Sequence, residues 1–592
     1  MSTPKNKSKK SRPFYNKQVA ALGKFILDDL SVIERVETEL SSNPLLKDCC
    51  VVFISVCNMK NRALVFKGTG PTPGEAWKNA EIKVNNIIRQ DNFKVVWVKA
   101  DIVNSAEEIP VTDLNKAIIE HQLMFFFRKG IALDPYFDTA FLEAEINGNR
   151  LIDYYTEQQM SNNEIDYDSV RLDLPRINRY LKDNYGVKGV SSIPDKIITF
   201  TTIGYFCDEN LDIHRLHDKG FDFGRRIIEK IDKKAVDPVM ISAAEYLFGM
   251  IKPDGEYIYG YHPIAHKEIS DYNILRHAGS IWSLINLYRI TRNDALIDRL
   301  NSAIDYLTDG HVVYKEENVA FVYEKKSDEI KLGGNGLTII MLTEYMDVFE
   351  TDRYVGLVSD LANGILEMEN PDTGEYFHVW NYPDFSPKEE FRTIYYDGEA
   401  TFALTRAYTY TKDEKYLNGA KMAVENLIAK DYTKHMDHWV SYALNEITKY
   451  IPDIRYFEFA MQNAGNNFKR IYNRARSAQT NLELLMMTWQ TYRRITELKI
   501  TSPYLDEFDV GYLARTIYQR ARHLLNGFFY PEFAMYMDRP NRVVGSFFVR
   551  EDRFRIRIDD IQHYIGGYYF YSKYFEEILP HLSQDFLDGY NA

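Results

Sequence analysis

The chain has 592 residues, of which 45% are hydrophobic, and its 72 Lys and Arg against 85 Asp and Glu give a net charge of −13. This composition excludes an intrinsically disordered protein, and the acidic balance argues against specific binding of nucleic acid. The longest apolar runs, such as Ile197–Phe206, are shorter than the roughly 20 residues of a spanning helix, so we expect no transmembrane segment. Aromatic residues are unusually frequent, at 14%.

The cysteines and the N-terminus bear on the cellular compartment. A chain of this length with four cysteines, two of them adjacent, cannot build the disulfide framework of a secreted protein; the four are Cys49, Cys50, Cys57 and Cys207. Residues 1–17 are basic, but no apolar stretch of the kind found in signal peptides follows them. We therefore expect a disordered tail over 1–17 and a cytoplasmic location.

The pattern over residues 18–110 predicts a small α/β domain. Two β-rich runs, Cys50–Cys57 and Arg62–Lys67, flank a short polar turn that is typical of a hairpin. Thr72 has the spacing of a capping box and opens a helix, and Phe93–Val103 follows as a third strand. Hairpin, helix and strand in this order resemble the core of the AMME-syndrome candidate-region family. The cysteine-containing glycine turn of that family is replaced here by Lys67-Gly68-Thr69-Gly70.

Residues 111–235 have a helical periodicity without a recognisable motif. Helices are expected at 112–128, 137–152 and 175–184. We predict that this stretch is a helical connector between its two neighbours.

Two kinds of helix alternate over residues 236–592. One kind is apolar on nearly all sides, which is typical of buried helices. These helices are expected to begin near Arg276, Gly333, Tyr395, Asp437, Ala478 and Asp559. The other kind is amphipathic and charged, and is expected at about 238–250, 293–307, 352–368, 413–428, 454–465 and 509–526. The sequence thus predicts a mainly α protein in which six buried helices alternate with six surface helices.

Hairpins rich in glycine and aromatic residues recur between these helices, as DGEYIYGYHP at 254–263, TGEYFHVWNY at 373–382 and a longer segment at 527–548. Helix pairs with such hairpins resemble the six-hairpin, or (α/α)6 toroid, superfamily. It contains glycoside hydrolases, unsaturated glucuronyl hydrolases, polysaccharide lyases and sugar 2-epimerases. The resemblance implies a toroid over 236–592, a role in carbohydrate or polysaccharide metabolism, and an active face where the inner helices begin.

Carboxylates stand at two of these helix starts. Glycosidic bond cleavage needs one carboxylic acid to protonate the leaving oxygen and a second carboxylate to activate water or attack carbon. Asp397 and Asp560 are the predicted catalytic pair of a glycoside hydrolase, with Glu399 and Asp559 in reserve. The alternative for each is a helix start stabilised by the helix dipole alone.

Histidines support a second hypothesis, a sugar epimerase, in which basic groups remove and return a proton. His277, His438 and His563 begin three different buried helices. A structural role in hydrogen bonding is the alternative. The other residues expected to bind substrate are Arg276, Asn335, Gln479, Tyr259 and Trp380.

A third hypothesis is a non-catalytic component that binds a glycan or a protein during polysaccharide assembly. No HExxH motif occurs, and no cysteine follows Cys207 that could ligate zinc in the toroid, so we expect neither a metal nor a cofactor. The expected partner is a carbohydrate substrate.

Overall fold

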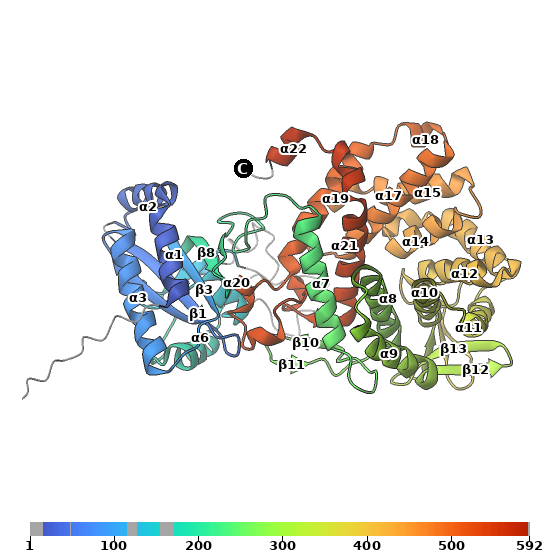
Figure 1. Cartoon of the computed structure of the whole chain (residues 1–592), viewed down its shortest axis with the longest axis horizontal. Coiled ribbons are helices and arrows are strands. Elements are labelled where there is room, and N and C mark those ends of the chain that lie inside the picture. The colour runs from blue at the N-terminus through green and yellow to red at the C-terminus, as the bar shows by residue number, and fades with distance from the viewer. Residues whose placement is uncertain (1–15, 48, 115–126, 154–170, 590–592) are drawn as a thin grey trace, which may run out of the picture. The chain divides into compact units, whose positions relative to one another are not determined.

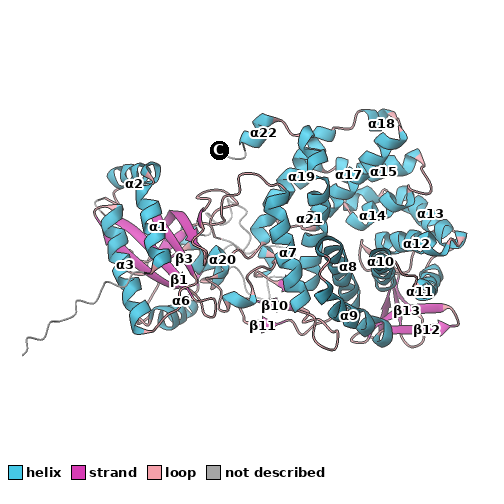
Figure 2. Cartoon of the chain, in the orientation of Figure 1, coloured by secondary structure: helices cyan, strands magenta, loops and turns pink. Residues whose placement is uncertain are grey.

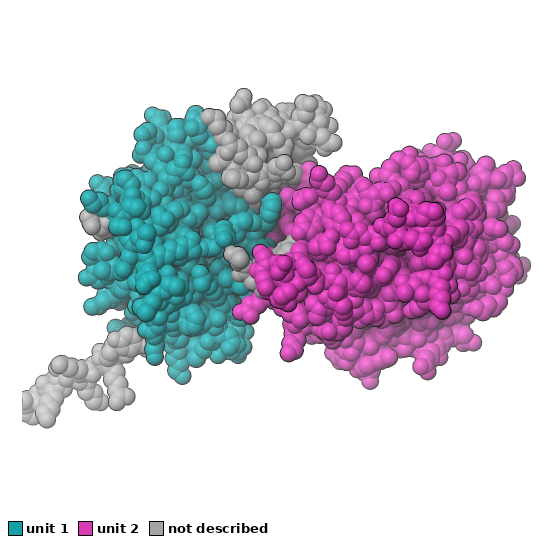
Figure 3. All heavy atoms as spheres, turned by 90° about the horizontal axis from the view of Figure 1, so that it is seen from above, with its two compact units in different colours: residues 1–227, 529–544 teal, residues 228–528, 545–592 magenta. Residues whose placement is uncertain are grey.

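The computed structural model describes residues 16–47, 49–114, 127–153 and 171–589. The chain divides into two compact units (Figure 3). Unit 1 comprises Met1–Ile227 and Phe529–Val544, and unit 2 comprises Ile228–Phe528 and Gly545–Ala592. Nearly all of the predicted disordered tail lies outside the described residues.

An antiparallel sheet forms the centre of unit 1 (Figure 2). Its described strands follow the order β2-β1-β3-β8-β4-β5, and β9 pairs with β8. Their bounds are Leu64–Gly70 for β2, Cys50–Cys57 for β1, Trp97–Pro110 for β3, Lys196–Cys207 for β8, Gly130–Ala132 for β4, Ala140–Phe141 for β5 and Ile213–Arg215 for β9. Every residue of β1 is buried. The helices α1 (Lys17–Asp28), α2 (Leu30–Ser42) and α3 (Pro73–Gln90) pack on strands of this sheet (Figure 1).

The elements predicted for the α/β domain are confirmed. The hairpin is β1 and β2, in which Ile54 pairs with Phe66. The helix α3 begins at Pro73, and the Thr72 hydroxyl accepts the N–H of Glu75 at 3.3 Å, as the capping-box spacing predicted. The third strand is β3.

The helical connector predicted over 111–235 is wrong in its main feature, because this stretch supplies β8 to the sheet. Asp101 of β3 pairs with Gly204 of β8. Rich in β-branched and aromatic residues and almost wholly buried, β8 fits a central strand that is covered on both faces. The described helices here are short, α5 (Glu143–Gly148) and α6 (Leu174–Tyr180), and most of the helix expected at 112–128 lies outside the described residues.

Unit 1 also includes a segment distant in the sequence, Phe529–Val544. The Tyr536 hydroxyl donates to Ser55 Oγ on β1 at 2.8 Å, and the N–H of Ala63 donates to the carbonyl of Met535 at 2.7 Å. The predicted helical domain over 236–592 is therefore not one uninterrupted stretch of chain.

The buried helices of unit 2 form a closed cycle of neighbours. Among the described residues, six helices contact one another in the order α8, α10, α12, α14, α17, α21 and back to α8 (Figure 1). Their bounds are Ile274–Thr291, Leu332–Phe349, Tyr396–Thr411, His438–Ile447, Thr480–Leu498 and Ile558–Ile578. Each begins within a few residues of its predicted start, so the prediction of these helices is confirmed. We call them the inner helices.

The surface helices lie against the inner ones. Their bounds are Lys233–Gly249 for α7, Ile297–Gly310 for α9, Val355–Glu367 for α11, Glu414–Ala429 for α13, Ile454–Gly465 for α15 and Val510–Leu524 for α19. Each packs on at least one inner helix, as α11 does on α10 and α12. The amphipathic pattern in the sequence is explained by this position, because only one face of each surface helix is covered.

Short sheets accompany the helices of unit 2. One contains β10 (Gly260–His262), β11 (Lys267–Glu268) and β17 (Ile556–Arg557), and β17 leads directly into α21. The other contains β12 to β16, with bounds Val312–Glu316, Val319–Glu324, Glu329–Lys331, Val379–Asn381 and Pro387–Glu389. Two of the predicted hairpin segments thus supply β10 and β15.

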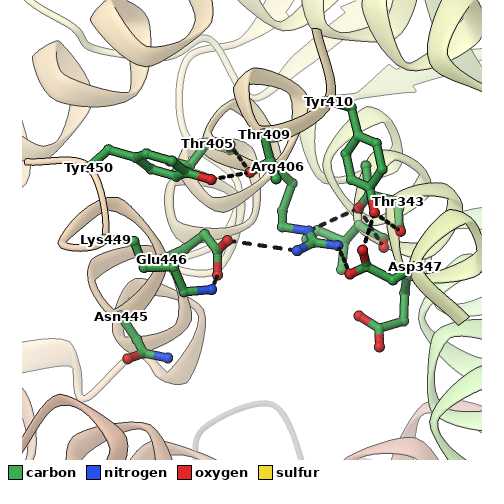
Figure 4. A network of polar contacts seen from close by, with 12 residues as sticks. Thr343, Asp347, Thr405, Arg406, Thr409, Tyr410, Asn445, Glu446, Lys449 and Tyr450 are labelled. Atoms are coloured by element: carbon green, nitrogen blue, oxygen red, sulfur yellow. Dashed lines mark hydrogen bonds and ion pairs between the residues drawn. The ribbon is translucent and has the colours of Figure 1, made fainter. Parts of the chain in front are cut away.

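Polar side chains fill the space between the C-terminal halves of three inner helices (Figure 4). Arg406 of α12 donates to Asp347 Oδ2 of α10 at 2.8 Å and to Thr343 Oγ1 at 3.2 Å. Its guanidinium also lies 3.7 Å from Glu446 Oε1 of α14. The side chain of Arg406 is only 10% exposed, so this network is an internal link between helices.

Among the described helices, none has both the length and the apolar character needed to cross a membrane. All four cysteines are unpaired.

Candidate functional site

A pocket of about 500 Å³ lies where the inner helices begin. Every inner helix contributes a lining residue from its N-terminal part or from the residues just before it, for example Arg276, Lys331, Glu399 and His438. The segment before α21 adds Arg555 and Arg557, and aromatic rings come from Tyr395, Tyr396 and Trp439.

Two adjacent carboxylates of α21 line the pocket and differ in their surroundings. Burial opposes the charge of Asp559, but ion pairs with Arg276 Nε at 2.9 Å and Arg557 Nη2 at 2.7 Å outweigh it and lower the pKa of Asp559. Asp560 accepts from Arg555 Nε at 3.0 Å, yet burial and the neighbouring charge of Asp559 raise the pKa of Asp560.

Glu399 is a third carboxyl of the pocket and is fully buried. Burial, followed by the charge of Asp437, raises the pKa of Glu399 well above its usual range. Its Oε2 atom has no hydrogen-bond partner within the part of the chain that the structure describes. Gly333 leaves room for it, because a Cβ at this position would lie 2.0 Å from Glu399 Oε2. Glu399 is thus a buried carboxyl group of the pocket whose surroundings disfavour the charged form.

Two histidines meet beside a buried glutamate. His563 Nδ1 lies 2.7 Å from Glu483 Oε2, and His438 Nε2 lies 3.9 Å from the same oxygen. The two imidazole rings are 5.0 Å apart in an edge-to-face arrangement. Gly566 allows Glu483 to lie there, since a Cβ would come within 2.5 Å of Glu483 Oε1.

The surroundings drive the two imidazoles towards opposite protonation states. Burial lowers the pKa of His438 well below its usual range, and neither ring nitrogen of His438 has a hydrogen-bond partner among the described residues. Burial also acts against the charge of His563, but the contact with Glu483 outweighs it and raises the pKa of His563. The pKa values of the two imidazoles are therefore shifted in opposite directions, that of His438 downwards and that of His563 upwards.

His438, Glu483 and His563 also have a donor set that could hold a metal ion, because one ligand atom from each lies within 4.8 Å of the others. Two imidazoles and a carboxylate suit zinc or another first-row transition metal. A metal at this place would replace the contact between His563 and Glu483.

The structure brings together seven of the twelve residues predicted for the site. They are Glu399, Asp559, Asp560, Arg276, His438, His563 and Gln479. Gln479 donates to Asp560 Oδ1 at 3.1 Å.

The remaining five predicted residues do not line this pocket. Asp397 accepts from His378 Nε2 at 2.9 Å and from the Tyr432 hydroxyl at 3.2 Å. Asn335 bonds backbone groups of Val322, Ala320 and Leu361. His277 bonds Tyr272 and the carbonyl of Ala303, Tyr259 accepts from Arg276, and Trp380 packs on Phe321. The predicted pair of Asp397 and Asp560 is therefore not a pair of pocket-lining carboxylates.

Sequence reasoning missed several cations of the pocket, namely Lys331, Arg392, Arg555 and Arg557. The last two stand in the alternating pattern Arg553-Phe554-Arg555-Ile556-Arg557 just before the acidic start of α21, a signal that could have been used.

No protein family matches this sequence, and no curated protein does. Solved structures that match this chain include a D-mannose isomerase, at 12% identity and a TM-score of 0.45, over 58% of this chain and 98% of that chain. Cellobiose 2-epimerase from Bacillus thermoamylovorans has 11% identity and a TM-score of 0.41, over 50% and 87% of the two chains. A GH76 α-mannanase from Bacteroides thetaiotaomicron has 11% identity and a TM-score of 0.39, over 58% and 97%.

Proposed function

We propose that unit 2 is an (α/α)6 toroid and that its pocket is the active site of a carbohydrate-active enzyme that isomerises or epimerises a sugar. The observation that carries this proposal is the pair of neighbouring histidines, of which His563 contacts Glu483 and His438 has no hydrogen-bond partner among the described residues, so that their pKa values are shifted in opposite directions. Groups whose surroundings separate their pKa values are candidates for a base and an acid acting together. His438 is the base, and His563, oriented by Glu483, is the acid.

The lining of the pocket supports a sugar as the substrate. Aromatic faces such as that of Tyr395, which is 38% exposed, can stack on a sugar ring. Buried polar atoms without partners among the described residues, including Glu399 Oε2 and Gln562 Nε2, require hydrogen bonds that a polyhydroxylated ligand supplies.

The chemistry starts from an open-chain sugar with a carbonyl at C1. His438 takes the proton from C2 while His563 gives its proton to the carbonyl oxygen, and an enediol results. Return of the first proton to C1, with transfer of the O2 proton to His563, gives the ketose and restores both histidines. Rings 5.0 Å apart cannot stand on opposite faces of a sugar, so the arrangement favours isomerisation over epimerisation from two sides.

Deuterium exchange tests this proposal. The full chain is incubated in heavy water with a panel of aldoses and ketoses, and the recovered sugars are examined by NMR and mass spectrometry. We expect deuterium at C1 or C2 of at least one sugar together with its isomer. Release of reducing ends from an oligosaccharide without exchange would overturn the proposal.

Such release would support the second candidate, a glycoside hydrolase. The observation in its favour is that Glu399 and Asp560 both line the pocket and both have raised pKa values, as a general acid requires. Asp559, kept ionised by Arg276 and Arg557, would then be the carboxylate that assists water.

Glu483→Gln tests the protonation states directly. The wild-type rate should be bell-shaped around the ordinary imidazole pKa of about 6.5, falling in acid as His438 gains a proton and in alkali as His563 loses one. Without Glu483 the pKa of His563 loses the largest contribution that opposes burial, so the alkaline limb should move to lower pH. A pH–rate profile checks this, and an unchanged alkaline limb would exclude His563 as the acid.

A further inference from the structure

The cations of the pocket differ in whether they have a carboxylate partner. Each of the four arginines has a carboxylate oxygen within 3.0 Å: Arg276 with Asp559, Arg392 with Glu329, Arg555 with Asp560, and Arg557 with Asp559. Lys331 is the exception. Its Nζ has no hydrogen-bond acceptor within the described ranges, and its nearest carboxylate oxygen, Glu329 Oε2, is 3.8 Å away.

Glu329 balances the charge of Lys331 only in part, because its oxygens already accept hydrogen bonds from other cations. Arg392 donates to both of its oxygens at 2.9 and 3.0 Å, and Lys388 Nζ lies 2.8 Å from Oε1. The side chain of Lys331 is only 13% exposed, so water does not fully solvate its ammonium group. A largely buried cation without a close partner is costly.

The charged neighbours of Lys331 act on it in both directions. Burial is the main cause that lowers the pKa of Lys331; the charges of Glu324 and Glu329 oppose this shift, and those of Arg392 and Arg276 add to it. Lys331 directly precedes α10, and the first turn of α10 has no side-chain cap. The positive end of the helix dipole therefore adds to the same wall of the pocket. An anion placed there would give Lys331 the acceptor that it lacks.

We propose that Lys331 is the anion-binding residue of the pocket and that the substrate is a sugar carrying an anionic group, a carboxylate or a phosphate. This inference rests on the proposed sugar site. Lys331 would donate a hydrogen bond to an oxygen of the anionic group. Arg276 and Arg392 would add to the positive electrostatic potential there while keeping their ion pairs with Asp559 and Glu329.

Binding of defined sugars to the full chain tests the proposal without any turnover. Glucose, glucuronate and glucose 6-phosphate are titrated separately by calorimetry at low ionic strength, and the two anions distinguish a carboxylate from a phosphate. A charge-assisted hydrogen bond predicts that at least one anion binds about 10- to 100-fold more tightly than glucose. Added salt should reduce this preference only partly, because Lys331 is largely buried.

Variants separate Lys331 from its surroundings. Lys331→Met should abolish the preference for the anion, whereas Lys331→Arg should retain it. Lys388→Met is the matched control, because Lys388 is closer to Glu329 but does not line the pocket. We expect the preference to survive in Lys388→Met, and circular dichroism verifies that each variant is folded.

Three results would overturn the inference: equal affinity for glucose and both anions, no binding of either anion, or a preference that persists in Lys331→Met. Each is distinguishable from failure of the proposed reaction. Anion binding without deuterium exchange would remove the proposed reaction and leave Lys331 as an anion site. Deuterium exchange on neutral sugars, without a preference for either anion, would remove Lys331 as an anion site and leave the proposed reaction.

Discussion

Replacing His438 by Gln should lower the turnover of the exchanging sugar by about 10²- to 10⁴-fold, the contribution expected of a general acid or base. Glutamine retains much of the volume of the imidazole and can donate a hydrogen bond, but it cannot take a proton from carbon. His563→Gln should have an effect of the same size, because the carbonyl oxygen of the sugar then lacks the group that donates a proton to it. Initial rates and deuterium incorporation measure both losses.

His277→Gln is a matched control for this experiment. His277 is also a buried histidine at the start of an inner helix, but both of its nitrogens have partners, the Tyr272 hydroxyl at 2.7 Å and the carbonyl of Ala303 at 2.8 Å. Its loss should affect folding stability more than turnover. Asp397→Asn should leave turnover within about tenfold of wild type, below the range of a general acid or base. If either control lost as much as His438→Gln, the assignment of the histidine pair would be contradicted.

The helices of unit 2 could be predicted because burial leaves a strong mark on sequence. An inner helix is covered on all sides, as α10 is, and is therefore apolar all round, whereas a surface helix such as α13 is apolar on one face. Two of the six starts are also marked by capping residues, Asn273 before α8 and Asp437 before α14; the Oδ1 atom of Asp437 accepts the N–H of Trp439 at 2.9 Å.

The strand β8 and the segment Phe529–Val544 could not be assigned in the same way. A strand buried on both faces loses the alternation that identifies an exposed strand, so its apolar run resembles that of a buried helix. The partners of β8 and of Phe529–Val544 are far away in the sequence, and no local pattern specifies such pairing.

Helical geometry explains why only some of the predicted carboxylates line the pocket. Asp397 and Glu399 are two residues apart on α12, which turns their side chains apart by roughly 200°. Both satisfy the preference for acidic residues in a first turn, so the sequence does not distinguish them. Lys331 was missed because it contacts the pocket from the end of β14, before α10, outside the helix starts that the repeat emphasises.

Replacing Arg406 by Met should lower the free energy of unfolding by about 3 kcal/mol or more, since removing one partner of a buried ion pair typically costs 3–5 kcal/mol. Glu446, whose side chain is 7% exposed, would keep its ion pair with Lys449 at 2.6 Å. It would lose the positive charge of Arg406, which lies on the side that faces the other inner helices. Asp347 would lose the hydrogen bond from Arg406 at 2.8 Å. Urea unfolding followed by circular dichroism measures the change.

Arg455→Met is the matched control for this prediction. Arg455 also contacts two carboxylates, Glu425 at 2.8 Å and Asp453 at 2.7 Å, but its side chain is 54% exposed. Exposed ion pairs contribute little, so Arg455→Met should change stability far less than Arg406→Met does. Equal losses in the two variants would contradict the structural role of the network.

A double variant separates charge from packing at Arg406. If the loss arises from an unbalanced buried carboxylate, Arg406→Met combined with Glu446→Gln should be more stable than Arg406→Met alone, because no isolated charge is left on the inner side of α14. If the double variant is instead destabilised by the sum of the two single losses, packing of the arginine stem is the main contribution. Because the network connects α10, α12 and α14 in their C-terminal halves while the histidines stand at the helix starts, none of these variants should alter the pH–rate profile of the folded protein.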